Sequence, residues 1–290
     1  IGVAMGLRGT DVARESADLV LLDDAFSSVV GGVRMGRRIF DNLRKAMAYI
    51  IAIHVPIAGL SLLPVILQAI TQKSWPLILL PVHIVFLELI IDPACSVVFE
   101  MEPEESGLMQ RKPRHVGETL FSRKMVVVSL LQGLIVLLAV FGVYALARHL
   151  DRGEDDARAL AFTTLIVANI GLILSNRSWS DGLVRTLAAR NTALWWVVPG
   201  ALAMLAAVLL IPELRKLFHF SALPLRDIGI CLAAGLGSIF WFEVYKLWGR
   251  HRSAVPHDNR APRTMGPRPT QSARNRRKAK RKGFKKYAHR

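Results

Sequence analysis

The chain has 290 residues, of which 52% are hydrophobic and 21% charged, and its formal net charge is +16. Its mean hydropathy of +0.35 exceeds that of an ordinary soluble domain, which argues against a soluble enzyme and for an integral membrane protein. Both cysteines, Cys95 and Cys231, lie inside apolar runs, so neither a disulfide framework nor a zinc site is indicated.

Residues 1–36 have the pattern of a small α/β unit. Residues 1–5 and 19–22 are short apolar runs typical of buried strands, and Thr10 or Asp11 can cap a helix between them. Two strands bury too little apolar surface to form a core of their own. We therefore expect this unit to be the end of an α/β domain whose remainder lies outside the sequence.

Six apolar runs are long enough to cross about 30 Å of hydrocarbon, which takes roughly 20 residues. They lie at 46–67, 77–99, 124–147, 158–175, 193–211 and 225–247. Helical spacing over 36–48 continues into the first run, so one long helix should join the α/β unit to the membrane. Within that run, Pro56 and Gly59 predict local unwinding. The sequence thus predicts a mainly α fold, with a polytopic six-helix transmembrane bundle over 37–248 after a short α/β fragment.

Positive charge is unevenly distributed. Residues 250–290 contain 15 Lys or Arg and one acid, Asp258, so the segment 249–290 is expected to be a basic, disordered tail. Loops 100–124 and 176–190 carry five and three Lys or Arg, whereas each of the other loops between spans carries at most two. The positive-inside rule then places both termini in the cytoplasm, and we expect a multi-pass protein of the plasma (inner) membrane.

Two acidic residues, Glu88 and Asp92, interrupt the second apolar run. Carboxylates inside a bilayer are costly and usually functional. Their i, i+4 spacing places both on one helix face, and Pro93 removes a backbone donor, which frees carbonyl oxygens nearby. The alternative is a structural pair satisfied by neighbouring helices. We favour a cation site, because the turns on either side carry no Lys or Arg.

Three stretches carry a resemblance to a known family: residues 1–26, residues 36–45, and the run Leu-Glu-Leu-Ile-Ile-Asp-Pro at 87–93 followed by Met-Gln-Arg-Lys-Pro-Arg at 109–114. In this order and spacing, the chain resembles the C-terminal part of type II P-type cation-transporting ATPases, the group that contains the calcium and sodium–potassium pumps. The resemblance covers roughly residues 1–250. It implies that 1–36 is the end of the phosphorylation (haloacid dehalogenase-like) domain and that the six spans correspond to helices five to ten.

The resemblance also implies site residues. Glu88 and Asp92 match ion-coordinating positions on the sixth helix, His54 a ligand position on the fifth, and Asn169 one on the eighth. Taken without the resemblance, His54 could equally be a hydrogen-bonding group between helices, and for Asn169 such a packing role is favoured. Ile57 stands where calcium pumps have a second acidic ligand, which implies one ion or a different cation. Two carboxylates and carbonyls suit Ca²⁺, Mn²⁺, Mg²⁺, Na⁺ or protons.

The catalytic motifs of the family do not occur in this sequence. It contains no Asp-Lys-Thr-Gly-Thr phosphorylation motif, no Thr-Gly-Glu loop and no Gly-Asp-Gly-Val-Asn-Asp segment. We therefore assign no catalytic or cofactor-binding residue, and expect no ATP hydrolysis by these residues alone. ATP and Mg²⁺ would act only through the catalytic half of an intact pump, and a separately encoded catalytic half is one expected partner.

The expected partners are membrane lipids, that catalytic half, and anionic lipid at the basic tail. Lys and Arg interleaved with Phe284 and Tyr287 could also bind nucleic acid, but the adjacent membrane span favours lipid. The main hypothesis is the membrane-embedded C-terminal portion of a cation-transporting P-type ATPase. The alternative is a non-catalytic membrane protein, either a pump remnant or a passive cation-binding bundle.

Overall fold

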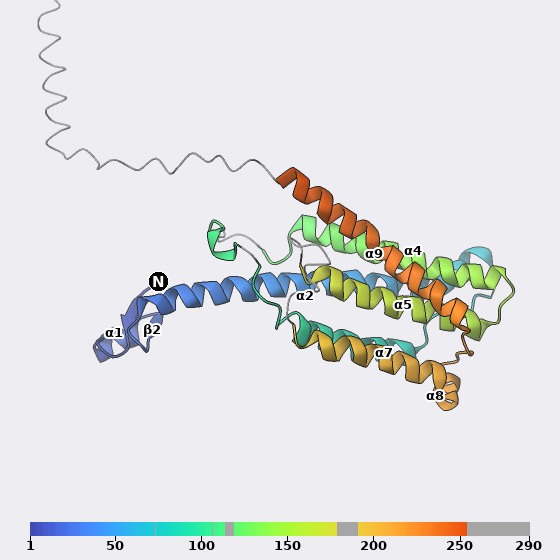
Figure 1. Ribbon diagram of the computed structural model, residues 1–290. Coiled ribbons are helices and arrows are strands. Elements are labelled where there is room, and N and C mark those ends of the chain that lie inside the picture. The colour runs from blue at the N-terminus through green and yellow to red at the C-terminus, as the bar shows by residue number, and fades with distance from the viewer. Residues whose placement is uncertain (73, 106, 114–118, 179–190, 254–290) are drawn as a thin grey trace, which may run out of the picture. The chain divides into compact units, whose positions relative to one another are not determined.

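The computed structural model describes residues 1–72, 74–105, 107–113, 119–178 and 191–253 (Figure 1). At the N-terminus, strand β1 (Val3–Met5) pairs in parallel with β2 (Leu19–Leu21), and helix α1 (Asp11–Ser16) lies between them in sequence. The Thr10 hydroxyl accepts a hydrogen bond from the Ala13 N–H at 3.2 Å and caps α1. The strand–helix–strand unit expected from the sequence is therefore present.

The turn before helix α2 (Phe26–Thr71) is closed by Asp23. Its carboxylate accepts hydrogen bonds from the Ser28 hydroxyl at 2.6 Å and from the Ala25 N–H at 3.0 Å. Both hydrogen bonds favour the ionised form, the one from Ser28 more strongly, and they hold the pKa of Asp23 below its usual value. Asp23 thus has the turn-forming role that a carboxylate between a strand and a helix predicts.

Helix α2 has 46 residues and is about 69 Å long at 1.5 Å per residue. It continues without a break through Pro56 and Pro64, so the predicted local unwinding of the first span is wrong. Pro56 cannot donate to the carbonyl of Ala52, and that oxygen faces Gly133 of the neighbouring helix α4. Close packing by a neighbouring helix is one way in which a membrane helix tolerates an internal proline.

The longer of the remaining helices agree with the predicted spans, whereas η2 and α8 lie in the loops between spans. They are α3 (Pro81–Pro93) with the π-helical turn η1 (Ala94–Val98), the short 3-10 helix η2 (Leu108–Gln110), α4 (Arg123–His149), α5 (Glu154–Asn176), α7 (Leu194–Leu210), α8 (Pro212–Leu217) and α9 (Leu225–Ser253). Among the described residues, five helices are long and apolar enough to cross a membrane: α2, α3 with η1, α4, α5 and α9. Helix α7 has 17 residues, the lower end of the spanning range. The mainly α membrane bundle is confirmed.

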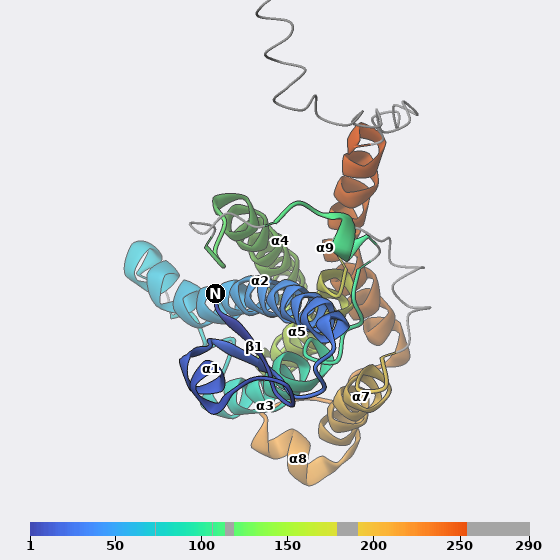
Figure 2. The ribbon, with the colours of Figure 1, turned by 90° about the vertical axis from the view of Figure 1, so that its left-hand side faces the viewer.

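Helix α5 forms the centre of the bundle. In the apolar 18-residue stretch of α5, 94% of the residues are buried, against 28–39% in the corresponding stretches of the other four long helices. Helices α2, α4 and α7 pack around it (Figure 2). Helix α9 approaches closely where Gly235 lies against Val167, because glycine leaves room for a neighbouring side chain. Residues 249–253, which the sequence assigns to the basic tail, belong to α9, and the rest of that expected tail, 254–290, lies outside the described residues.

A buried histidine joins the start of α3 to the end of α8. The Leu80 N–H donates to His83 Nδ1 at 3.0 Å, so Nε2 carries the ring proton and donates to the Phe218 carbonyl at 2.8 Å. The ring stacks on Phe218 and Phe220, with centroids 5.5 and 4.9 Å away. His83 thereby fixes the end of the helix that carries Glu88.

The connector that follows η1 is anchored by a buried carboxylate. Glu102 accepts hydrogen bonds from Arg177 Nε at 2.8 Å and Asn191 Nδ2 at 2.7 Å, and the Asn42 side chain donates to its carbonyl oxygen at 2.8 Å. The side chain of Arg177 is fully buried. These contacts tie the connector to α2, to the residue after α5 and to the chain before α7.

Candidate cation-binding site

Glu88 and Asp92 lie on successive turns of α3, as their spacing predicts. Within the described part of the chain, the Glu88 side chain is 39% exposed and Asp92 is exposed, so both lie at the edge of the bundle rather than in its core. Carboxylates at such an edge are accessible to an ion or to a further helix. The carboxylate face of α3 is therefore polar and incompletely covered by the described residues.

His54 of α2 is the side chain that the structure brings to Glu88. Its Nε2 lies 3.7 Å from Glu88 Oε1. His54 Nδ1 lies 2.8 Å from the Ile50 carbonyl oxygen, which can only accept, so Nδ1 carries a proton. In the neutral ring Nε2 then presents a lone pair toward the carboxylate, at a separation beyond hydrogen-bond length. With the ring neutral, two electron-pair donors face each other between α2 and α3.

The helix changes its winding directly after Asp92. Pro93 ends α3, and residues Ala94–Val98 form a π-helical turn in which the Phe99 N–H donates to the Ala94 carbonyl at 3.2 Å. Because Pro93 has no N–H, the Leu89 carbonyl has no α-helical donor. The Asp92 carbonyl accepts a hydrogen bond from the Ser96 hydroxyl at 2.7 Å. Single π-helical turns occur frequently at functional sites. The expected disturbance of backbone bonding is present beside Asp92.

Asn169 occupies a different environment. It is fully buried on α5, and its Oδ1 accepts a hydrogen bond from the Tyr49 hydroxyl of α2 at 2.6 Å. Its Nδ2 has no hydrogen-bond partner among the described residues. The hydrogen bonds that the structure describes therefore tie Asn169 to Tyr49 rather than to either carboxylate. The sequence reasoning did not single out Tyr49, because one tyrosine in an apolar helix carries no distinguishing pattern.

The predicted site residues are brought together only in part. His54 and Glu88 approach each other, Asp92 follows one turn later, and Asn169 is linked to α2 through Tyr49. Within the described ranges, no three His, Cys, Asp or Glu side chains gather closely enough to hold a metal. A cation here would need further ligands from carbonyl oxygens, water or another segment.

Comparison with known proteins gives a consistent result. The family described as "Cation transporting ATPase, C-terminus" matches residues 76–248, more than half of the chain. The calcium-transporting ATPase of Bacillus subtilis is 30% identical over 230 residues, 78% of this chain and 25% of that protein. Calcium-transporting ATPase 1 of Bacillus cereus is 31% identical over 263 residues, 85% of this chain and 29% of that protein.

A third relative is named for another cation. The human potassium-transporting ATPase alpha chain 2 is 39% identical over 158 residues, 52% of this chain and 15% of that protein. The chain spans about a quarter of the length of the calcium-transporting relatives that it matches. With its apolar helices and the match over 76–248, the chain belongs to the P-type cation-transporting ATPases, of which it represents the C-terminal transmembrane domain.

Proposed function

We propose that this chain supplies the cation-binding part of an ATP-driven cation pump, with Glu88, Asp92 and His54 as ligands. The observation that carries the proposal is the 3.7 Å separation between His54 Nε2 and Glu88 Oε1. Two donors that each bind one ion at about 2.0–2.6 Å lie about 3–4.5 Å apart, depending on the angle at the ion. A cation can therefore bridge α2 and α3 without moving either helix.

Asn169 is proposed as an additional ligand on the α5 side. An amide oxygen has two lone pairs, and the Tyr49 hydroxyl occupies one of them. The second lone pair can bind an ion, while Tyr49 holds the amide in a fixed orientation. In this arrangement Tyr49 is a positioning residue.

The proposed cargo is a single cation, with Ca²⁺ as the first candidate. Carboxylate and amide oxygens are the ligands that Ca²⁺ prefers, so Glu88, Asp92 and Asn169 would hold this ion and the His54 nitrogen would contribute least. The two bacterial relatives are named as calcium transporters. Ile57 at a position acidic in calcium pumps supports one ion rather than two. ATP and Mg²⁺ would act through catalytic domains outside these residues, on the same polypeptide or a separate one. We further propose that both termini face the cytoplasm and that the protein resides in the plasma (inner) membrane.

Metal-dependent thermal stabilisation of the purified chain tests the site. Wild type should be stabilised by Ca²⁺, and Glu88→Gln/Asp92→Asn should lose that stabilisation. The matched control Asp151→Asn/Glu213→Gln removes two carboxylates outside the candidate spans and should respond as wild type does. Equal metal responses in all three proteins, or none in any of them with Ca²⁺, Mn²⁺, Mg²⁺ and Na⁺, would contradict the site.

Reconstitution into liposomes distinguishes a pump from a passive bundle. A pump requires ATP-dependent uptake in the presence of the catalytic domains, and Asp92→Asn should abolish that uptake. Cation flux through the chain alone without ATP, also abolished by Asp92→Asn, would instead support a passive pathway. Both the pump and the passive pathway would use the same site, but only the pump would require ATP.

A further inference from the structure

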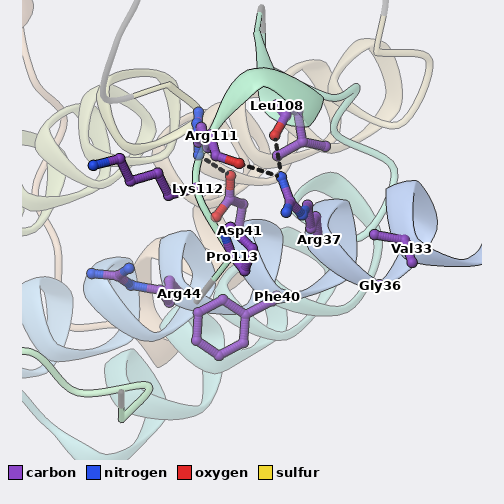
Figure 3. A pocket seen from close by; sticks show the side chains of 10 residues that line it. All are labelled: Val33, Gly36, Arg37, Phe40, Asp41, Arg44, Leu108, Arg111, Lys112 and Pro113. Atoms are coloured by element: carbon purple, nitrogen blue, oxygen red, sulfur yellow. Dashed lines mark hydrogen bonds and ion pairs between the residues drawn. The ribbon is translucent and has the colours of Figure 1, made fainter. Parts of the chain in front are cut away.

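A basic cavity lies outside the candidate cation site, against the part of α2 that precedes its apolar run. It has a volume of about 590 Å³ and lies between α2, η2 and the residues just after η2 (Figure 3). Its charged lining consists of four basic side chains and one acidic one, namely Arg37, Arg44, Arg111, Lys112 and Asp41. A cavity of this size can hold a small ligand, and its charge favours an anion.

Hydrogen bonds and ion pairs hold the wall of the cavity in place; they neutralise Arg111, which contacts the carboxylates of both Asp41 and Glu105, but not Arg37. Arg37 Nη1 donates to the carbonyl oxygens of Leu108 and Arg111, both at 2.9 Å, and Arg111 Nη1 donates to Asp41 at 2.6 Å. Carbonyl oxygens carry no formal charge, so Arg37 keeps its positive charge. In the described part of the chain, the Arg37 hydrogen bonds all leave from Nη1, and a guanidinium has five N–H donors in total.

The other two basic residues lie toward one side of the cavity. Figure 3 shows the side chains of Arg44 and Lys112 extending in the same direction, away from Arg37. Lys112 is exposed and Arg44 is half-buried, with its guanidinium 5.9 Å from the ring centre of Phe40. An anion that enters from this side meets a point charge on Lys112 and a planar donor group on Arg44.

The start of the apolar run of α2 indicates that the cavity lies near the membrane surface. Lys45 alone separates Arg44 from the apolar run of α2 that begins at residue 46, and Arg44 Nη2 is 3.4 Å from the hydroxyl of Ser122, which caps α4. Arg37 lies two helical turns further from the membrane, about 10 Å along the axis. Because the headgroup layer adds about 5–7 Å on each side of the hydrocarbon, the side of the cavity at Arg44 is level with lipid headgroups.

We propose that this cavity binds the phosphate of an anionic phospholipid headgroup. Arginine matches phosphate oxygens through paired N–H donors, and lysine contributes charge. Phe40 and Leu108 line the part of the cavity that lies further from the membrane than Arg44. This site is separate from the basic segment 249–290, and it would attach a lipid to the joint between α2 and the connector.

The test uses the full chain in nanodiscs of phosphatidylcholine that contain a minor fraction of phosphatidic acid. Retention of phosphatidic acid is measured by native mass spectrometry and by titration with a fluorescent phosphatidic acid. Arg44→Gln/Lys112→Gln should weaken binding by about tenfold to thirtyfold, given two lost basic contacts near the surface. The matched control is Arg123→Gln/Lys124→Gln. It removes two exposed positive charges at the N-terminal end of α4, outside the cavity.

The control variant should change phosphatidic acid binding by less than about threefold. The basic segment 249–290 is the same in all the proteins, so it cannot cause a difference between them. Equal weakening in both double variants would mean general surface attraction and would overturn the proposal, as would unchanged binding in the cavity variant. If the double variant does not fold, the single Lys112→Gln change at an exposed side chain provides the same comparison. In detergent, inorganic phosphate and glycerol 3-phosphate should compete poorly with the lipid; competition at equal affinity would assign the cavity to a soluble phosphate instead.

Discussion

The Tyr49 hydroxyl of α2 donates a 2.6 Å hydrogen bond to the side-chain amide oxygen Oδ1 of Asn169 on α5, and both side chains are fully buried. Since Asn169 Nδ2 has no partner among the described residues, Tyr49→Phe would leave the whole amide unpaired. We expect a loss of about 1–3 kcal/mol in the free energy of unfolding, measured by denaturation in detergent.

Tyr144→Phe is the matched control for this prediction. The Tyr144 hydroxyl is buried without a hydrogen-bond partner in the described structure, so its removal breaks no hydrogen bond. This variant should be as stable as wild type or slightly more stable. Equal losses from both substitutions would show that the Tyr49–Asn169 bond contributes nothing specific.

Gly133 of α4 lies directly against the backbone of α2. A Cβ atom at this position would be 2.4 Å from the Ala52 carbonyl oxygen and 2.6 Å from Val55 Cβ. Gly133→Ala should therefore separate the two helices and cost about 1–3 kcal/mol, measured as a lower thermal unfolding temperature. Gly142→Ala on the same helix meets nothing within 4 Å and should be neutral or stabilising, because alanine favours helix. The same response at both positions would contradict close packing at Gly133.

Glu102 compensates the buried Arg177 guanidinium. Glu102→Gln removes the negative charge while retaining the shape, and the cost of a broken buried ion pair is about 3–5 kcal/mol. Glu104→Gln changes a neighbouring carboxylate whose contact with Arg34 at 3.6 Å is solvent-exposed, and should cost less than about 1 kcal/mol. Chemical denaturation of the two variants under identical conditions measures the difference. A smaller effect at Glu102 than at Glu104 would be incompatible with the buried pair.

The turn before α2 should respond to pH through Asp23. Its pKa is lowered by hydrogen bonds from Ser28 and Ala25, so these bonds stabilise the turn above the usual pKa. That contribution is lost as the pH falls through the lowered value. Ser28→Ala should raise the pKa of Asp23 toward its usual value, measured by carbon-13 NMR titration of the carboxyl group. Ser27→Ala should leave it unchanged, and a shift in that variant alone would disprove the assignment.

Much of the bundle could be predicted from the sequence, because length and apolar content determine which segments can span a bilayer. The six apolar runs and the strand–helix–strand unit all correspond to observed elements. Pro56 was misleading, because proline predicts a broken helix only when nothing supports the helix from outside. Here α4 packs against the position through Gly133, and that contact cannot be inferred from α2 alone.

The candidate site was predictable only as a set of residue types. Glu88 and Asp92 were identifiable because charge inside an apolar run is costly, and their shared face follows from helix geometry. Neither the approach of His54 to Glu88 nor the pairing of Asn169 with Tyr49 could be derived from spacing, since each joins two helices. Such contacts depend on how helices rotate and cross, which periodicity does not determine.

The π-helical turn at Ala94–Val98 contains one residue more than the same length of α-helix would need. Before the turn, Glu88 lies beside His54 of α2. At the end of the turn, the Val98 carbonyl accepts a hydrogen bond from the Asn191 side chain, and the ring of the next residue, Phe99, lies 5.4 Å from the ring of Tyr49. Rewinding the turn to α geometry would rotate Asp92 by about 100° relative to Phe99, because one residue is equivalent to that angle. Because His83 fixes the start of α3 and these contacts hold its far end, the π-helical turn sets the direction in which both carboxylates point.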